Sequence, residues 1–479
     1  MAFLIPGVFL GKKANDLRAQ NRGSSAFIEG SPFTHKEFTM HKTLKAILRP
    51  IAILICLTML FCGLLFLAGL GGEPIQARVR EHVGESIPLF EAEGSYPELL
   101  NVKSQFYTLD NFTETIILQE ALFMDTARHP INIFENPRVN LIDVPEGTNA
   151  KVASLIAAVN GEQANSKYSY YWMGFRSIVR PLLIFMNYPY IRMFLSLGFY
   201  LLFAATCFSL YRHANMQAMI AFLFATLGVN CMVASVELQY ATCFYVMFFA
   251  MLLLPYIKKT RFSYPEFFLI VGACTQFFDF YTTPVITLGG PLLFLLASQN
   301  LLADTDTKWK VFLKCSLFWL LGYGATWLIR LMLVYAVTNE NIFAEAFQKL
   351  RVWTGVTYDS RYSDHSIFGA IWGNVRGIFI YPNLPMYGVT AMATCVLYIM
   401  RNKQRKLRRP LTISLFVALL PILWIAVSYH AAIVHNWFQY RSLFVLIFGV
   451  LVFAFSPFIQ DDRPEKKIAL EQEPKQSVA

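Results

Sequence analysis

Charged residues are scarce in this chain. Asp, Glu, Lys and Arg make up 15% of its 479 residues, whereas hydrophobic residues make up 56% and the mean hydropathy is +0.44. So little charge cannot cover the surface of one soluble globule. The composition therefore excludes a soluble protein and predicts an all-α polytopic membrane protein.

Cysteine is absent from every polar stretch, and the chain has no internal repeat. All eight cysteines lie in apolar segments, at Cys56, Cys62, Cys207, Cys231, Cys243, Cys274, Cys315 and Cys395. None can staple an exposed loop, so neither a disulfide framework nor a cysteine metal site is implied. The net charge of +10 is carried by short basic runs between apolar segments, which is typical of membrane topology and predicts no nucleic-acid partner.

Ten apolar runs are long enough to be predicted as transmembrane helices. The first, residues 51–70, follows a basic leader, residues 1–50, and precedes a large insert, residues 71–180. The multi-span region 181–458 contains a second long loop near residues 338–385, and residues 459–479 form a polar tail. Its nine predicted spans lie near residues 191–210, 216–235, 241–257, 266–279, 285–302, 315–337, 386–400, 411–429 and 443–458.

The basic residues of the short loops predict the orientation. One set of alternate loops holds twelve of them, and the opposing turns 236–240, 280–284 and 430–440 hold none. Because basic loops stay in the cytoplasm, both termini are predicted to be cytoplasmic and the insert to face outward, with the chain in the plasma membrane. The twelve are Arg212, Lys258, Lys259, Arg261, Lys308, Lys310, Arg401, Lys403, Arg405, Lys406, Arg408 and Arg409.

The insert is predicted to form short helices along the outer leaflet and not a separate soluble domain. Residues 115–127 and 150–159 have apolar residues at helical spacing. The aromatic run 168–172 suits an interfacial belt in which rings lie at headgroup level.

Asp110 is the first candidate site residue. An outward acid beside the membrane can act as a general base toward an acceptor hydroxyl or hold a divalent cation. The same residue can cap a helix that starts near Asn111, and spacing alone leaves both interpretations open. Glu114 is predicted to be a solvated first-turn charge, and Asn111-Phe112-Thr113 matches an N-glycosylation acceptor.

The other candidates are charged or titratable groups at or near the outward ends of spans. Asp279 precedes the helix-terminating Pro284, and either a site or a structural role explains it. Guanidinium forks match phosphate oxygens, so Arg330, inside an apolar span, and Arg441 are predicted to bind a phosphate. Snorkelling explains Arg176, Arg180 and Arg192. His430 and His435 are five residues apart, a poor spacing for a zinc site.

Several of these features resemble a known superfamily. The order of the segments in this chain is similar to that of the GT-C superfamily of membrane glycosyltransferases, which use polyprenyl-phosphate-linked sugars. This order is one span, then an outward loop that contains Leu109-Asp110-Asn111-Phe112-Thr113, and then many spans. Three further segments resemble poorly characterised bacterial members of this superfamily. They are residues 277–292, residues 322–327 with a basic residue nearby, and the His-rich turn that ends in Tyr440-Arg441. Many members carry a pair of acids soon after the first span, whereas here Asp110 has Asn111 beside it, so no metal ligands are assigned.

The resemblance implies transfer of a sugar from a polyprenyl-phosphate donor to an envelope glycan or lipid-linked acceptor at the outer face of a bacterial plasma membrane. Asp110 would be the base, and Asp279 would orient the acceptor or a divalent cation. Arg330, Arg441 and His435 would hold the donor phosphate. The alternative is a transporter or lipid-linked glycan flippase without covalent chemistry, which would place ionisable residues near the bilayer midplane.

Overall fold

The computed structural model describes residues 32–99, 104–141, 144–145, 149–298, 301–302, 307–356, 366–380, 388–389, 392 and 411–456, with side chains from Ile47 onward. The tail, the basic run 401–409, most of the leader and most of the predicted span 386–400 lie outside these residues. The chain divides into two units, Met1–Ile51 and Ala52–Ala479. The first contributes only the beginning of α1 (Pro32–Ala68) to the described residues.

The described structure is predominantly helical, as expected, and its only two strands are two residues each. Five helical segments are long and apolar enough to cross a membrane: Ile47–Ala68, Tyr188–His213, Leu238–Lys259, Lys308–Thr338 and Asn436–Phe455. Shorter apolar helices, among them Met216–Gly228, Val285–Ala297 and Ile413–Val427, accompany them. The length of these segments makes the chain compatible with membrane insertion.

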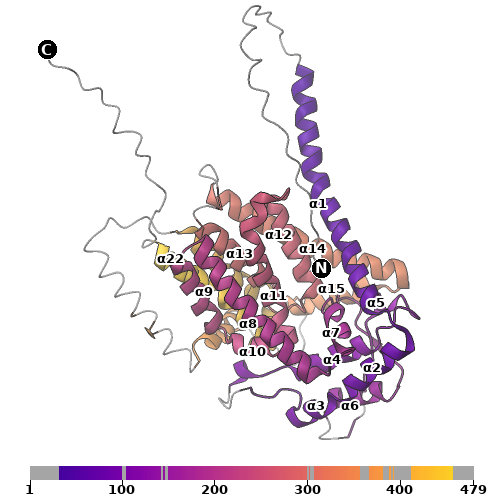
Figure 1. The fold of residues 1–479 in the computed structure, drawn as a ribbon. Helices are drawn as coiled ribbons and strands as arrows, with labels where there is room; N and C mark the ends of the chain where they lie inside the picture. The colour runs from indigo at the N-terminus through magenta and orange to yellow at the C-terminus, as the bar shows by residue number, and fades with distance from the viewer. Residues whose placement is uncertain are drawn as a thin grey trace, which may run out of the picture. The chain divides into compact units, whose positions relative to one another are not determined.

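The helices after the insert form a bundle (Figure 1). Polar caps start several of them: Asn187 caps α8, and Ser263 and Glu266 form a capping box on α12. The core is rich in aromatic residues such as Phe222, Phe244 and Phe444. The elements are α8 (Tyr188–His213), α9 (Met216–Gly228), α10 (Cys231–Ser235), α11 (Leu238–Leu253), η2 (Leu254–Lys259), α12 (Tyr264–Phe278), α13 (Val285–Ala297), α14 (Lys308–Thr338), α15 (Ile342–Trp353), α16 (Ile367–Val375), η4 (Arg376–Ile378), α18 (Ile413–Ala418), α19 (Leu420–Val427), α20 (Tyr429–Val434), α21 (Asn436–Gln439), η5 (Tyr440–Leu443) and α22 (Phe444–Phe455).

The insert packs at one end of this bundle (Figure 1). Its core includes Leu238, Leu331 and Val334 from α11 and α14, so the insert shares its hydrophobic interior with the bundle. Strands β1 and β2 pair antiparallel. The elements are α2 (Gly72–Gly84), α3 (Ile87–Glu93), η1 (Gln105–Tyr107), α4 (Asn111–Leu122), α5 (Asn132–Glu135), β1 (Pro137–Arg138), α6 (Ala150–Val159), β2 (Ser166–Lys167) and α7 (Arg176–Leu183).

Two predictions about the insert need correction. The helix α6 matches the predicted residues 150–159, but α4 ends at Leu122 and buries every side chain from Glu114 to Leu122, so it is not a surface helix with one wet face. The aromatic run does not form an exposed belt, because Tyr170, Tyr171 and Trp172 are buried and the indole N–H of Trp172 donates to the carbonyl of Thr326 at 2.9 Å.

The three arginines expected to snorkel instead tie the insert together. Arg176 and Arg180 are buried, and Arg180 donates to the carbonyl oxygens of Ala68 and Ala121 at 3.0 and 3.1 Å. Arg192 forms an ion pair with Glu93 at 3.1 Å. Because these guanidinium groups have partners inside the protein, the side chains do not extend to headgroups.

Candidate functional site

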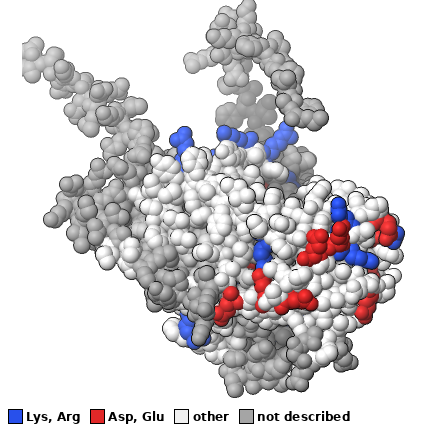
Figure 2. Space-filling model, turned by 60° about the horizontal axis from the view of Figure 1, so that its bottom comes forward, with Lys and Arg blue, Asp and Glu red and all other residues white. Residues whose placement is uncertain are grey.

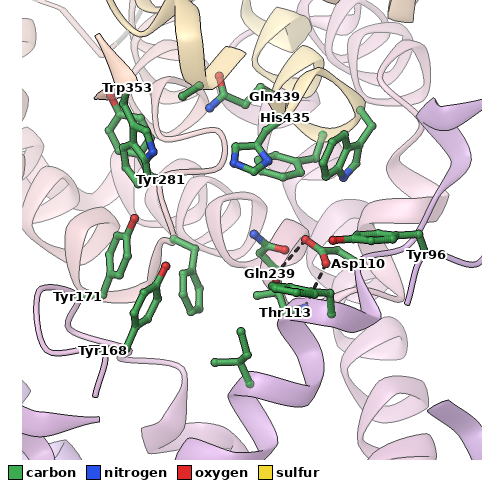
Figure 3. A pocket seen from close by; sticks show the side chains of 16 residues that line it. Tyr96, Asp110, Thr113, Tyr168, Tyr171, Gln239, Tyr281, Trp353, His435 and Gln439 are labelled. Atoms are coloured by element: carbon green, nitrogen blue, oxygen red, sulfur yellow. Dashed lines mark hydrogen bonds between the residues drawn. The ribbon is translucent and has the colours of Figure 1, made fainter. Parts of the chain in front are cut away.

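A cavity of ≈ 150 Å³ lies where the insert meets the bundle (Figure 3). The insert contributes Tyr96, Asp110 and Thr113. The turns that the charge pattern predicts to face outward contribute further polar side chains, with Gln239 from 236–240, Tyr281 from 280–284, and His435 and Gln439 from 430–440. Segments far apart in the chain therefore converge on one space.

Asp110 lies in the wall of this cavity and also caps α4. Its Oδ1 accepts the main-chain N–H of Thr113 at 3.1 Å, and its Oδ2 accepts the Thr113 hydroxyl at 2.9 Å. The side chain is only 4% exposed. Burial raises the pKa of Asp110 from 3.8 to about 6, against the opposite effect of the two hydrogen bonds from Thr113. A carboxylate with a pKa in this range is a stronger base than an exposed one and still ionised at neutral pH.

Several polar atoms around the cavity have no hydrogen-bond partner in the described structure. They are both amide atoms of Gln439, the carbonyl oxygen of Gln239, the indole N–H of Trp437 and Nδ1 of His435. Buried polar atoms are normally paired, so this set indicates a ligand or water that supplies the missing partners. Amide donors and acceptors beside aromatic faces suit a molecule with several hydroxyl groups and apolar C–H faces.

His435 is a neutral member of this set. Burial, together with the positive charge of Lys349 and with His430, lowers the pKa of His435 to about 4. Its ring stacks on Phe438 with centroids 5.1 Å apart. A neutral imidazole can donate or accept one hydrogen bond at the cavity but brings no positive charge there at neutral pH.

A second, more apolar groove of ≈ 250 Å³ adjoins the cavity. Tyr171, Tyr281 and Trp353 line both spaces and so separate them. The groove is lined mainly by aromatic and aliphatic side chains from α14, α15 and α19. Lys349 is the one charged side chain among the described residues that line it, and its Nζ lies 5.9 Å from the ring centroid of Trp353. A polar cavity therefore lies beside an apolar groove, and the Lys349 side chain brings a positive charge to the groove.

Asp279 lies outside the lining of the cavity and shapes one of its walls. Its Oδ1 accepts the main-chain N–H of Thr282 at 3.0 Å and the Thr282 hydroxyl at 2.5 Å. These bonds close the turn after α12, in which Tyr281 has a φ of 64°. A positive φ is costly for a tyrosine, so the turn needs this support to present the Tyr281 ring to both spaces.

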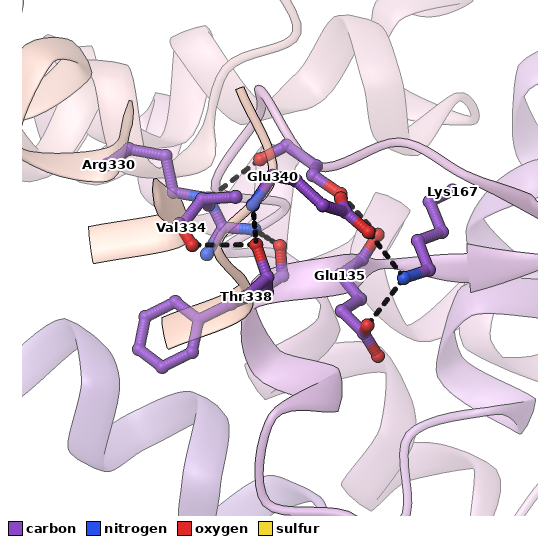
Figure 4. A network of polar contacts seen from close by, with 8 residues as sticks. Glu135, Lys167, Arg330, Val334, Thr338 and Glu340 are labelled. Atoms are coloured by element: carbon purple, nitrogen blue, oxygen red, sulfur yellow. Dashed lines mark hydrogen bonds and ion pairs between the residues drawn. The ribbon is translucent and has the colours of Figure 1, made fainter. Parts of the chain in front are cut away.

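Arg330 does not line the cavity either. Its guanidinium donates to the main-chain carbonyls of Ser169, Ile133 and Phe134 at 3.0, 2.9 and 2.7 Å. Lys167 joins the same region of the insert to the short link between α14 and α15, because its Nζ bonds Glu135 at 2.6 Å and Glu340 at 2.7 Å (Figure 4). With its fork satisfied by backbone, Arg330 fastens the insert to α14, and this geometry does not support the predicted phosphate contact.

Arg441 is buried beside the cavity. It lies over the ring of Tyr240 at 4.5 Å and donates to the carbonyls of Trp437 and Phe106 at 3.2 and 3.4 Å. Its Nε has no partner in the described structure. Arg441 thus joins the 430–440 turn to the insert, and it does not line the space next to Asp110.

Two further sequence-based predictions concern the glycosylation motif and a possible cation site. The amide of Asn111 is buried and donates to Glu93 and to the carbonyl of Gly94 at 2.9 Å, so the glycosylation motif is occluded. Within the described residues, no three His, Cys, Asp or Glu side chains are grouped as metal ligands.

Sequence reasoning missed Gln239, Gln439 and Lys349. The two glutamines are uncharged polar residues in predicted outward turns, and that position was the available signal. No protein-family model, curated protein or solved structure matches this chain.

Proposed function

We propose that the chain is a GT-C type membrane glycosyltransferase that moves a sugar from a polyprenyl-phosphate donor to an acceptor hydroxyl at the outer face of the membrane. We assign it ten spans, cytoplasmic termini and an outward insert. The observation that carries the proposal is Asp110, a buried acid with a raised pKa in a cavity lined by aromatic rings and unpartnered amides.

In this proposal Asp110 removes the proton of the acceptor hydroxyl. The acceptor oxygen then forms a bond to the anomeric carbon as the bond from that carbon to the phosphate oxygen breaks, and the phosphate leaves with the electron pair. The amides of Gln239 and Gln439 hold the sugar hydroxyls, and the aromatic rings cover its C–H faces. Stabilising the leaving phosphate requires a positive group or a strong donor nearby.

We place the donor lipid in the apolar groove, with its phosphate between Lys349 and His435. Lys349 supplies a positive charge, and its lowering effect on the pKa of His435 indicates that the two side chains lie near each other. His435 supplies a neutral hydrogen bond. The predicted roles of Arg330 and Arg441 are replaced here, because both guanidinium groups are engaged by main-chain carbonyls.

The test compares Asp110→Asn with Asp125→Asn in purified protein reconstituted in lipid, with polyprenyl-phosphate sugars as donors. Both aspartates accept a main-chain N–H three residues later, but only Asp110 lines the cavity. Loss of a general base should lower turnover by about 10²–10⁴-fold in Asp110→Asn and leave Asp125→Asn active. Normal turnover in Asp110→Asn would leave only the capping role.

A polar chamber beside an apolar groove also fits a flippase for lipid-linked glycans, because both activities recognise the same amphiphile. The two functions differ in their product. A transferase makes a new glycosidic bond and releases the lipid phosphate, whereas a flippase moves the donor unchanged across the bilayer. Movement of intact donor without release of lipid phosphate would favour the flippase.

A further inference from the structure

Two carboxyl groups are buried directly behind the cavity wall. Glu114, one helical turn after Asp110, is fully buried and not a solvated charge. Its Oε2 accepts a hydrogen bond from the hydroxyl of Tyr188, and its Oε1 accepts the main-chain N–H of Gln239 at 3.0 Å. Both oxygens therefore act as acceptors, and one of them receives a free N–H at the start of α11, where negative charge is favoured.

Glu237 is the second carboxyl group, in the residue that precedes α11. It is 0% exposed, and as a carboxylate neither of its oxygens has a partner. Its side chain lies within hydrogen-bonding reach of Glu114. Two carboxylates cannot bond each other, and an unpaired buried charge is very unfavourable. One proton between them removes the repulsion and gives Glu237 the donor that the contact needs.

The charged groups around the pair do not fully neutralise an ionised Glu237. Arg192 on α8 is the cation that acts on the charge of Glu237. Its Nη1 bonds Glu93 of α3 at 3.1 Å, its Nη2 bonds the side-chain oxygen of Asn111 at 2.9 Å, and its Nε has no hydrogen-bond partner in the described structure. The other titratable groups that face the pair are Tyr188 of α8, Asp110 beside α4 and Tyr240 of α11. Arg192 attracts an ionised Glu237, but no hydrogen bond joins the two in the described structure, so ionised Glu237 would remain a second buried negative charge next to Glu114 and would be offset only in part.

We propose that Glu237 is a neutral carboxylic acid whose proton is donated to Glu114, and that this shared proton holds the start of α11 against α4. Gln239, two residues after Glu237, is thereby kept in the cavity wall facing Asp110. Glu237 and Glu114 are positioning residues in this account, since neither lines the cavity. The catalytic consequence rests on the proposed function, whereas the shared proton does not.

The pH dependence follows from the protonated state. Burial, and to a lesser degree Glu114, raises the pKa of Glu237 well above its ordinary value. A raised folded-state pKa means that the contribution to stability is complete only below the unfolded-state pKa, declines as the pH rises, and is lost once the pH has passed through the folded-state pKa. Once the pH has risen through that folded-state pKa, the two carboxylates should repel, and the contact between α4 and α11 should weaken.

Infrared spectroscopy of the purified full-length protein in lipid tests the proton directly. The carbonyl stretch of a protonated carboxyl should be present at neutral pH, lose one component in Glu237→Gln, and be unchanged in the control Glu91→Gln, an exposed residue of α3. Glu120, whose pKa burial raises to about 8, gives a separate component that Glu120→Gln removes. An unchanged spectrum in Glu237→Gln would overturn the proposal. So would failure of that variant to fold, because its amide can still donate to Glu114.

The positioning role is tested by the pH profiles of stability and turnover. Wild-type protein should lose thermal stability and turnover as the pH rises into the alkaline range, and Glu237→Gln should lose less of both, because its amide cannot ionise. Identical alkaline losses in the two proteins would overturn the positioning role. If no sugar transfer is found at all, the proposed function fails, while the infrared and thermal measurements still decide on the shared proton.

Discussion

Asp110 combines two roles that sequence spacing presents as alternatives. Its oxygens cap α4 through Thr113, and the same carboxyl lines the cavity. The cap requires only an oxygen acceptor, whereas a base requires an ionisable group with a raised pKa. Burial provides the second property, and burial depends on chain segments that no local pattern around Asp110 reveals.

This double role predicts that Asp110→Asn is more stable than wild type at neutral pH. The pKa of Asp110 is raised from 3.8 to about 6, so its contribution to stability is complete below pH 4 and is lost as the pH rises through 6. Asparagine keeps the cap without ionising. The gain should be roughly 2–3 kcal/mol at pH 8 and near zero at pH 4. Thermal unfolding at both pH values measures this gain in stability. An equal gain at pH 4 and pH 8 would argue against a carboxylate that burial destabilises.

Lys349 is predicted to bind the donor phosphate. Replacing it with methionine keeps an unbranched apolar stem but removes the charge, so Lys349→Met should raise the KM for the lipid-linked donor by about tenfold or more. Arg351→Met is the matched control, because Arg351 is exposed on the same helix and does not line the groove. Steady-state kinetics with varied donor measures the effect. Equal KM values for wild type and Lys349→Met would remove the phosphate from this position.

Arg330 should be a stability residue. Its fork spans three carbonyls of the insert, and lysine cannot reproduce that geometry, so Arg330→Lys should cost roughly 2–3 kcal/mol of unfolding free energy. Arg78→Lys, at an exposed site on α2, should cost almost nothing. Thermal unfolding and donor KM are measured together. A raised KM with unchanged stability in Arg330→Lys would restore the sequence-based assignment to the donor site.

At the scale of elements, the tight crossing of α12 and α14 depends on two glycines. A Cβ at Gly272 would lie 2.1 Å from the carbonyl oxygen of Trp319, and one at Gly322 would lie 2.1 Å from that of Leu269. Small residues allow such backbone approach between helices in membranes. Gly272→Ala and Gly322→Ala should each destabilise by about 1–3 kcal/mol. Gly324→Ala, with open space at its Cβ position on the same helix, should be neutral or stabilising by thermal unfolding.

The elements also show what sequence periodicity can predict. The helix α6 has one partly solvent-exposed face, which leaves a clear apolar periodicity in the sequence. The sequence therefore predicted both of its end residues correctly. The pattern failed for α4, which has partners on all sides and so carries polar residues such as Glu114 and Gln119 into the interior. Packing against other parts of the chain also explains the aromatic run. The sequence predicted Tyr168 and Tyr171 in an interfacial belt, whereas both line the cavity.

At the scale of the whole molecule, the charge pattern and the cavity are related. The turns predicted to face outward hold no basic residue, and all three of them reach the same cavity as the insert. Figure 2 shows acidic and basic side chains mixed on part of one face, beside a wide area without charge, which suits a protein only partly in contact with water. The charge pattern predicts which loops share a side of the membrane, but the residues that meet there depend on helix packing, which topology alone does not specify.

The orientation of the chain is the last prediction. In a cysteine-free version, Ala92→Cys on α3 should react with a membrane-impermeant thiol reagent in intact cells, because the insert is expected outside. Phe262→Cys, in the turn beside Lys258, Lys259 and Arg261, should react only after the cells are opened, because positively charged loops stay in the cytoplasm. Both side chains are exposed, so accessibility within the fold is matched. Labelling of Phe262→Cys in intact cells with protection of Ala92→Cys would invert the topology. It would also place the Asp110 cavity on the cytoplasmic side, where nucleotide-linked sugars and not only lipid-linked ones could reach it.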